Sequence, residues 1–174
     1  MALAQLSQIT VWQPEVRLTD PHVSSDDRNS LSIVFAMYEA LVRRNETSVY
    51  EPGLAESWSV SDDAREWTFS LRPGVRYHDG TTLSAHDVVA NLKRVCDPDM
   101  GGELGTQGVY RSYLEGADIE AVDRLTVRLV APRPFADLLD LIVKFPIAPR
   151  GALGQLSSEP VGSGPYRFVE AQEN

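Results

Sequence analysis

The chain has 174 residues, of which 43% are hydrophobic, and its 16 basic and 25 acidic side chains give a formal net charge of −9. That length suits one ordinary domain or two small ones with a buried core. The acidic balance and the lack of a basic stripe disfavour a nucleic-acid partner, and the single cysteine, Cys96, excludes an internal disulfide.

Neither a membrane span nor a leader is evident in the sequence. No apolar run approaches the ~20 residues that a bilayer-spanning helix needs. The opening "MALAQLSQIT" has neither the basic nor the apolar region of a secretory signal peptide. Composition therefore leaves two possibilities, a cytoplasmic protein or an exported protein that lacks its leader.

The N-terminal part predicts a short strand, a loop and a long helix. Alternation over residues 9–13 indicates the strand, and the polar "LTDPHVSSDD" is typical of a loop. We expect the helix to run from Asp26 to Val42, with Arg43 and Arg44 at its end, where cations suit the helix dipole. Its apolar residues recur at steps of three and four, as on a buried helix face: Leu31, Val34, Tyr38 and Leu41.

Two hairpins are predicted in the middle of the chain. The first runs from Trp58 to Leu71 around the polar turn "SDDARE", and the second spans residues 119–130 and turns at Asp123 and Arg124. The alternating apolar residues of the first hairpin are expected to form one buried face: Trp58, Val60, Trp67, Phe69 and Leu71.

The remaining segments predict helices and loops. Ser84, followed three residues later by Asp87, is the pattern of a capping box and predicts a helix. The Gly- and Asp-rich "CDPDMGGELGTQG" predicts a flexible surface loop. Pro134 should open a short helix, and a long turn-rich connection then leads to a new strand over residues 166–170. This order of helices and hairpins predicts an α/β fold of the mixed α+β type.

No catalytic constellation is evident. The carboxylate pairs Asp26-Asp27 and Asp62-Asp63 are typical of helix caps and solvated turns. Cys96 is expected to be a buried, inert thiol. We therefore predict no enzyme activity, no catalytic residue, no metal site and no cofactor. The three histidines lie outside any zinc motif and are expected on the surface or in loops: His22, His78 and His86.

Three stretches are more specific when taken together: "YEALV", "PGLAESWSVSDDAREWTFSLRPGVRYHDGTTLSAHDVVANLKR" and "PVGSGPYRF". In order and spacing they resemble the bacterial extracellular solute-binding proteins of family 5, which include the dipeptide-, oligopeptide- and nickel-binding proteins of ABC importers. The resemblance runs from about Ile9 to the end of the chain. It implies a periplasmic-binding-protein-like (type II) lobe with an inserted α+β subdomain.

Small residues in these motifs predict particular backbone shapes. Gly53 and Gly80 are expected in turns of positive φ. Gly162 and Gly164 should shape the start of a strand. The glycine that the family carries after the first tryptophan arm is replaced here by Asp63-Ala64, which predicts a loop of different shape.

The resemblance also implies a division of the chain. Residues 1–44 would form the first part of lobe I, residues 45–159 its inserted subdomain, and residues 160–174 the return to lobe I. Such proteins are much longer than 174 residues and have two lobes around a cleft. The chain therefore resembles an N-terminal fragment from which lobe II is absent.

Ligand-binding residues are implied by the same resemblance. In peptide-binding relatives, the loop between the first strand and the long helix reaches the ligand, as does a tyrosine of the inserted subdomain. Residue chemistry leaves alternatives open, since the serines and aspartates of the loop would also cap a helix and the tyrosines would also pack in the core or at its rim. The corresponding residues here are Ser24, Ser25, Asp26, Asp27 and either Tyr110 or Tyr113.

The implied function is that of the substrate-binding component of an ABC importer, which captures a small, peptide-like solute outside the cytoplasmic membrane by closing two lobes over it. Its partners would be the solute and the membrane subunits of an ABC permease. The implied location is the periplasm, or a lipid anchor on the outer face of the cytoplasmic membrane, with the signal peptide absent from this chain. The alternative is a solute-sensing domain of the same fold that acts in signalling or transcriptional regulation.

Overall fold

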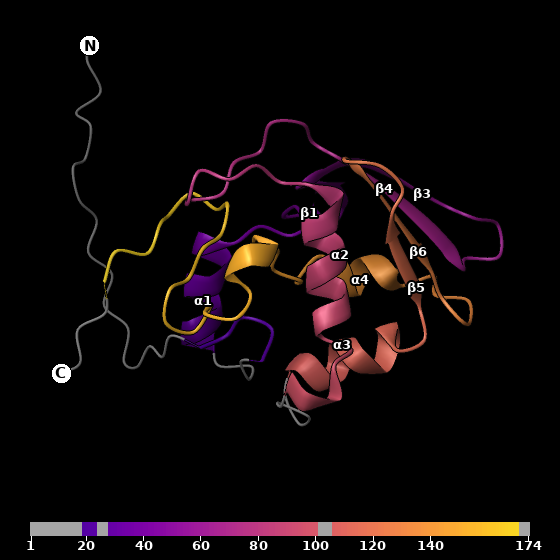
Figure 1. Ribbon diagram of the computed structural model, residues 1–174. Helices are drawn as coiled ribbons and strands as arrows, with labels where there is room; N and C mark the ends of the chain where they lie inside the picture. Colours follow the sequence, from indigo (N-terminus) through magenta and orange to yellow (C-terminus); the bar gives the residue numbers. More distant parts are fainter. Residues whose placement is uncertain (1–18, 24–27, 101–105, 171–174) are drawn as a thin grey trace, which may run out of the picture.

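A computed structural model describes residues 19–23, 28–100 and 106–170, and Figure 1 shows the mixed order of its helices and strands. The helices are α1 (Arg28–Met37), α2 (Ala85–Arg94), α3 (Thr106–Leu114) and α4 (Leu138–Ile142), with the 3₁₀ turns η1 (Pro98–Met100) and η2 (Arg150–Ala152). The strands are β1 (Val42–Arg44), β2 (Tyr50–Pro52), β3 (Ala55–Val60), β4 (Glu66–Leu71), β5 (Asp118–Ala121) and β6 (Thr126–Val130). The predicted mixed α and β composition is confirmed.

Four strands form the main sheet, in the order β3-β4-β6-β5 with all neighbours antiparallel. The pairs β3–β4 and β5–β6 are the two predicted hairpins, which the structure confirms. Trp58 pairs with Phe69 across the first hairpin, and Trp67 pairs with Leu129 of β6. Paired residues of antiparallel strands share a face, so these apolar side chains all lie on one side of the sheet.

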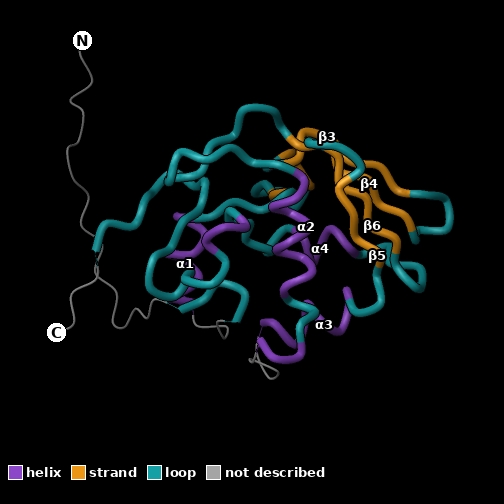
Figure 2. The backbone as a smooth tube through the Cα atoms, in the orientation of Figure 1, coloured by secondary structure: helices purple, strands orange, loops and turns teal. Residues whose placement is uncertain are grey.

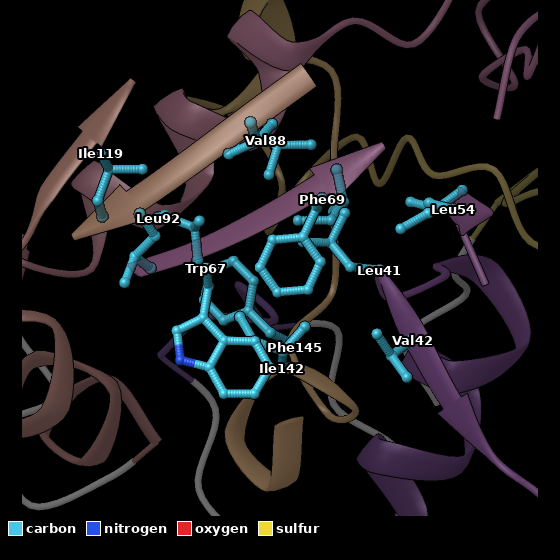
Figure 3. Packing of buried hydrophobic residues seen from close by; sticks show 14 of the residues in the cluster. Leu41, Val42, Leu54, Trp67, Phe69, Val88, Leu92, Ile119, Ile142 and Phe145 are labelled. Atoms are coloured by element: carbon cyan, nitrogen blue, oxygen red, sulfur yellow. The ribbon is translucent and has the colours of Figure 1, made fainter. Parts of the chain in front are cut away.

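That face is buried against α2 and against the segment that carries α4 (Figure 3). The predicted apolar face is right for Trp67, Phe69 and Leu71, which are buried, and wrong for Val60, which is exposed. Val60 ends β3, an edge strand. We call this cluster the sheet core; the members labelled in Figure 3 are Leu41, Val42, Leu54, Trp67, Phe69, Val88, Leu92, Ile119, Ile142 and Phe145.

Helix α2 begins where its capping residues predict. The backbone N–H of Ser84 donates to the Asp87 carboxylate at 2.9 Å, and the other carboxylate oxygen accepts from the backbone N–H of Arg150 at 3.0 Å. Asp87 therefore closes the helix start and also ties it to η2. Val88 and Leu92 are fully buried, which fixes the rotation of α2 and brings its last residue, Arg94, to the N-terminal turn described below.

Helix α1 is shorter than predicted, since it ends at Met37 and not at Val42. Gly164 donates a backbone hydrogen bond to the carbonyl of Met37 at 2.9 Å, and Tyr166 donates one to Ala36 at 3.1 Å. These carbonyls of the last turn are thus bound by a segment more than 120 residues away. Beyond them the chain turns into β1, so Arg43 and Arg44 lie on a strand and not at a helix end.

Other expectations are corrected by tertiary contacts. The predicted surface loop after Cys96 ends in α3, which already begins at Thr106. The helix expected from Pro134 begins at Leu138, because Phe135 donates its backbone N–H to Ala64 at 2.7 Å. Residues 166–170 are not a strand. The strand predicted over residues 9–13 and the acidic first turn of the long helix lie outside the described residues.

Glycine positions show two different constraints. Gly80 has a φ of +84°, as predicted, whereas Gly53 has no positive φ. A Cβ at Gly53 would lie 2.5 Å from the carbonyl oxygen of Ala40, so close backbone approach requires this glycine. In the turn that lacks the family's glycine, Ala64 adopts a φ of +54°. The left-handed conformation is therefore present there even though the glycine is not.

A second, smaller cluster surrounds α1, and we call it the α1 core: Val34, Met37, Tyr38, Ala148 and Leu156. Figures 1 and 2 show the C-terminal segment passing around α1 mostly as loop and turn. Within the described ranges, no helix has the length and apolar character that crossing a bilayer requires.

Candidate ligand-facing site

The predicted ligand loop, Ser24 to Asp27, lies outside the described residues, but the turn before it is described. In this turn the backbone N–H of Val23 donates to the carbonyl of Asp20 at 3.0 Å. The backbone N–H of His22 donates to Asp20 Oδ1, also at 3.0 Å. Asp20 thus shapes the chain that leads into the predicted loop, as short polar side chains commonly do next to a proline.

His22 lies in a turn, in agreement with the loop alternative of the prediction, but it is fully buried and not on the surface. Its Nε2 lies 2.8 Å from the carbonyl oxygen of Pro146, and its Nδ1 lies 3.0 Å from Arg94 Nη1. A carbonyl only accepts and a guanidinium only donates. The ring must therefore be the neutral tautomer with its proton on Nε2, donating to Pro146 and accepting from Arg94.

Arg94 also forms a forked ion pair with Asp20. Its Nη1 donates to Oδ1 at 3.0 Å, and its Nη2 donates to Oδ2. Both side chains are mostly buried. Because a guanidinium holds a carboxylate best through two parallel bonds, the end of α2 is fastened rigidly to the Asp20–Val23 turn.

Burial lowers the pKa of His22 from 6.5 to about 4, since the charged ring would lose its hydration. The positive charge of Arg94 acts in the same direction, while the bond to Pro146 and the charge of Asp20 oppose it. His22 is therefore neutral at pH 7, in agreement with the tautomer that its partners require.

One aromatic ring joins this turn to the tyrosine predicted as a ligand contact. Phe145 stacks on His22 with ring centroids 4.9 Å apart. The ring of Tyr110 packs edge-on against Phe145, with ring centroids 4.7 Å apart. The hydroxyl of Tyr110 donates to the carbonyl of Lys144 at 2.9 Å. The root of the loop at 24–27 and Tyr110 of α3 thus contact the same side chain, although almost 90 residues separate them.

The two candidate tyrosines differ in exposure. Tyr110 is buried, whereas Tyr113 is 42% exposed and stacks on Phe135 at 5.2 Å. An exposed ring that is already held parallel to a neighbour presents a rigid apolar surface to a solute. Tyr113 is therefore the more accessible of the two tyrosines.

The other titratable groups of interest do not join this cluster. His78 donates from Nε2 to the carbonyl of Gly164 at 2.8 Å and accepts at Nδ1 from the N–H of Gly162 at 3.3 Å, and His86 is exposed. Burial raises the pKa of the half-buried Cys96, so its thiol stays protonated at neutral pH. No group of three or more metal-ligating side chains occurs within the described part of the chain.

Sequence reasoning missed the Asp20–His22–Arg94 cluster. The "TDPH" motif carried a partial signal, because acidic and imidazole side chains beside a proline suit a constrained turn. No sequence signal singled out Arg94. The carbonyl of Pro146 carries no side-chain signal, so no sequence pattern could have revealed it as the partner of His22.

Comparison with known proteins shows the family to which the chain is similar. A family model described as "Bacterial extracellular solute-binding proteins, family 5 Middle" matches residues 49–174. Glutathione-binding protein GsiB of Shigella boydii serotype 4 (strain Sb227) is 31% identical over 155 residues, a match that covers 86% of this chain and 29% of that protein. This chain therefore spans less than a third of the length of that relative.

Solved structures show the same fold. The structure of MoaA in complex with mannopinic acid, from A. tumefacien R10, is similar with a TM-score of 0.75 and 31% identity, over 90% of this chain and 34% of that chain. The ABC transporter-associated periplasmic binding protein DppA of Helicobacter pylori, in complex with peptide STSA, gives a TM-score of 0.74 and 26% identity, over 88% of this chain and 35% of that one. The predicted periplasmic-binding-protein-like fold is confirmed, and the family model covers well over half of the sequence. The chain belongs to family 5 of the bacterial extracellular solute-binding proteins.

Proposed function

We propose that this chain is part of the substrate-binding component of an ABC importer, which captures a small, peptide-like solute outside the cytoplasmic membrane. The family match supports the general role, and similar proteins carry names that refer to glutathione and to peptides. The observation that carries the site is the meeting of the Asp20–Val23 turn and Tyr110 on Phe145. It brings α3, which carries the candidate tyrosines, together with the turn that precedes the loop assigned to the ligand by the family resemblance.

In this proposal the solute contacts Ser24, Ser25, Asp26 and Asp27 from one side and a tyrosine of α3 from another. The exposure of Tyr113 and its stacking on Phe135 favour it over the buried Tyr110 as the direct contact. No bond of the solute is made or broken, and closure of two lobes supplies the affinity.

The proposed division of the chain is 1–44, 45–159 and 160–174, with the opposite lobe supplied by polypeptide beyond this sequence. The two cores support the order of these parts but favour different boundaries, near residues 40 and 148. The sheet core takes its members from residues 41–147 and the α1 core from residues on either side of that range. Near the α1 core, Tyr166 is 60% exposed and Val169 is 80% exposed. Apolar side chains left in this way are suited to packing against further polypeptide.

The proposed partners are the solute and the membrane subunits of an ABC permease. The proposed location is the periplasm, or the outer face of the cytoplasmic membrane by means of a lipid anchor. Determining the reading frame on both sides of this sequence checks both points. A secretory leader and a second lobe support transport, whereas a fused DNA-binding domain would support the sensor alternative.

Calorimetric titration tests the binding function. The probes are glutathione, a dipeptide, a tripeptide, the tetrapeptide STSA and mannopinic acid, each titrated into the longer protein and into the 174-residue chain. We expect saturable binding of at least one probe by the longer protein, and weak or undetectable binding by the chain alone, since it supplies only part of the contact surface. Tight binding by the 174-residue chain would contradict two-lobe capture.

A further inference from the structure

The turn that leads into the predicted ligand loop is held by polar groups from remote parts of the chain. Arg94 comes from the end of α2, and the carbonyl of Pro146 comes from the segment after α4. Neither belongs to the turn or to the loop. The position of the Asp20–Val23 turn therefore depends on three side chains, which we call the His22 latch: Asp20, His22 and Arg94.

The bonds of the His22 latch form a closed circuit. Asp20 accepts from Arg94 and from the backbone of His22, and Arg94 donates to Asp20 and to the ring of His22. Within such a buried network, removal of one member leaves the other groups unsatisfied at a cost well above that of a single exposed bond. Arg94 is the only member that lies on a helix of the sheet core, so it connects the turn to the rigid part of the molecule.

The circuit can accommodate His22 only when the ring is neutral. A proton on Nδ1 would face the N–H of Arg94 at 3.0 Å, so that two donors would oppose each other. It would also place a second positive charge beside the guanidinium in a buried site. Protonation and a closed latch are therefore mutually exclusive.

The charges around His22 are few and identified. Asp20 faces it from its own turn, and Arg94 faces it from α2. In the segment after α4, the backbone carbonyl of Pro146 and the ring of Phe145 face His22. Directly after α1, the hydroxyl of Tyr38 is buried near the same Asp20–Arg94 pair, and its pKa is raised by burial and by Asp20. Of these groups, His22 is the one whose ordinary pKa lies between 5 and 8.

We propose that the His22 latch holds the Asp20–Val23 turn in place, and that protonation of His22 releases this turn, so that acid weakens solute capture. The second half of this statement rests on the proposed function, whereas the first concerns the turn alone. The ligand remains the peptide-like solute of the proposed function. Arg94 and His22 are positioning residues, and neither is among the predicted ligand contacts.

Hydrogen exchange measured by mass spectrometry tests the latch without any solute. The reporters are the backbone amides of His22 and Val23, both of which donate to Asp20. After correction for intrinsic rates, their protection should fall at least about tenfold between pH 7.5 and pH 5.0, because the open turn takes up a proton that the closed turn excludes. The backbone amides of β4 and β6 should keep their protection over the same pH range. Unchanged protection at the reporters, or simultaneous loss across the sheet, would overturn the proposal.

Variants separate positioning from general stability. Arg94→Gln should lower the protection of the reporters at both pH values, and Arg94→Lys should recover part of it by keeping one charged donor. Lys93→Gln is the matched control, since Lys93 is an exposed neighbour in the same helical turn. His22→Phe retains a ring against Phe145 but cannot titrate, and should abolish the pH dependence. If Arg94→Gln leaves the protection of the reporters unchanged, the proposal is wrong. If His22→Phe does not fold, the comparison of the wild-type protein at pH 7.5 and pH 5.0 still tests the proposal.

Binding by the longer protein then tests the consequence. Affinity for the best probe of the panel should fall at least about fivefold from pH 7.5 to pH 5.0, and this change should disappear in His22→Phe. If exchange shows the latch but no probe binds, the proposed function fails and the positioning role stands. If a probe binds but the protection of the His22 and Val23 amides does not change with pH, the latch proposal is wrong and the proposed function stands.

Discussion

The sheet core and the α1 core are held together by different forces. The sheet core contains large side chains buried on one face of four strands, including Trp67, Phe69 and Phe145. The α1 core has five buried members, and its surroundings are fastened by polar bonds and by close backbone approach at Gly162 and Gly164. Apolar burial is insensitive to pH, whereas polar bonds between few groups depend on the charge state of each one.

Two buried or half-buried histidines hold loop segments through polar bonds. His22 holds Pro146 and Arg94, and His78 holds the backbone of Gly162 and Gly164. Each ring donates from Nε2 and accepts at Nδ1. The difference teaches that the turn before the predicted ligand loop is held by polar bonds, which a proton on Nδ1 of His22 would break.

The largest expected effect is on the sheet core. Phe69→Ala should lower the free energy of unfolding by about 3–5 kcal/mol, since Phe69 is fully buried and its removal leaves a cavity. Urea unfolding followed by circular dichroism measures this change. Val122→Ala, in an exposed turn of the same sheet, should change the free energy by no more than about 0.5 kcal/mol. Similar effects of the two changes would mean that the sheet core is not the main source of stability.

The next effect is the response of the α1 side to acid. The pKa of His22 is about 4 in the folded protein and near 6.5 in the unfolded chain, so the unfolded chain binds the extra proton between these values. Stability should therefore be highest above pH 6.5 and should decline by up to about 3 kcal/mol as the pH falls to 4. Urea curves between pH 7.5 and 4.0 measure this decline, which should be absent in His22→Phe.

The sheet should respond to acid in a lower pH range. Hydrogen bonds from Arg128 lower the pKa of Glu66, and backbone and hydroxyl donors lower that of Asp123. A carboxylate with a lowered pKa contributes stability above its ordinary pKa, and that contribution is lost only as the pH falls further. Exchange at β4 and β6 should thus change below pH 4. A sheet that loses protection at pH 5 together with the N-terminal turn would contradict two separate ranges.

A smaller effect is expected where the C-terminal segment crosses α1. A Cβ at Gly162 would overlap the carbonyl oxygen of Met37 and lie 2.8 Å from Tyr38 Cδ1. Gly162→Ala should therefore cost about 1–3 kcal/mol, the usual range for overpacking. Thermal unfolding measures the loss. Gly154→Ala is the control, because nothing lies within 4 Å of the added Cβ; equal losses in both would show that backbone approach is not the cause.

The smallest effect concerns the turn between β3 and β4. Ala64 has a φ of +54°, where an L-residue is strained by about 1–2 kcal/mol. Ala64→Gly should remove that strain and add some freedom to the unfolded chain, for a net gain of roughly 0.5–1 kcal/mol. Ala90→Gly, inside α2, should instead lose about 1 kcal/mol. A loss of stability in both variants would show that the turn is not strained at Ala64.

Local patterns determined much of the sheet and of α2. Alternation and a polar turn specified each hairpin, and Ser84 with Asp87 specified the helix start, because these signals act between residues close in the sequence. The family motifs likewise marked the fold. The turn at Gly80 was also correctly predicted, because the local "HDG" pattern is typical of a turn that needs a positive φ.

Only the tertiary structure decided where α1 ends and which of the two candidate tyrosines is buried. The periodic pattern continued to Val42, yet hydrogen bonds from Gly164 and Tyr166 occupy the last carbonyls of the helix, and the chain continues as a strand. The burial of His22 and its contact with Phe145 and Arg94 follow from segments more than 70 residues away. Sequence determines the bonds that form between neighbours, but a partner distant along the chain is chosen only when the cores have packed.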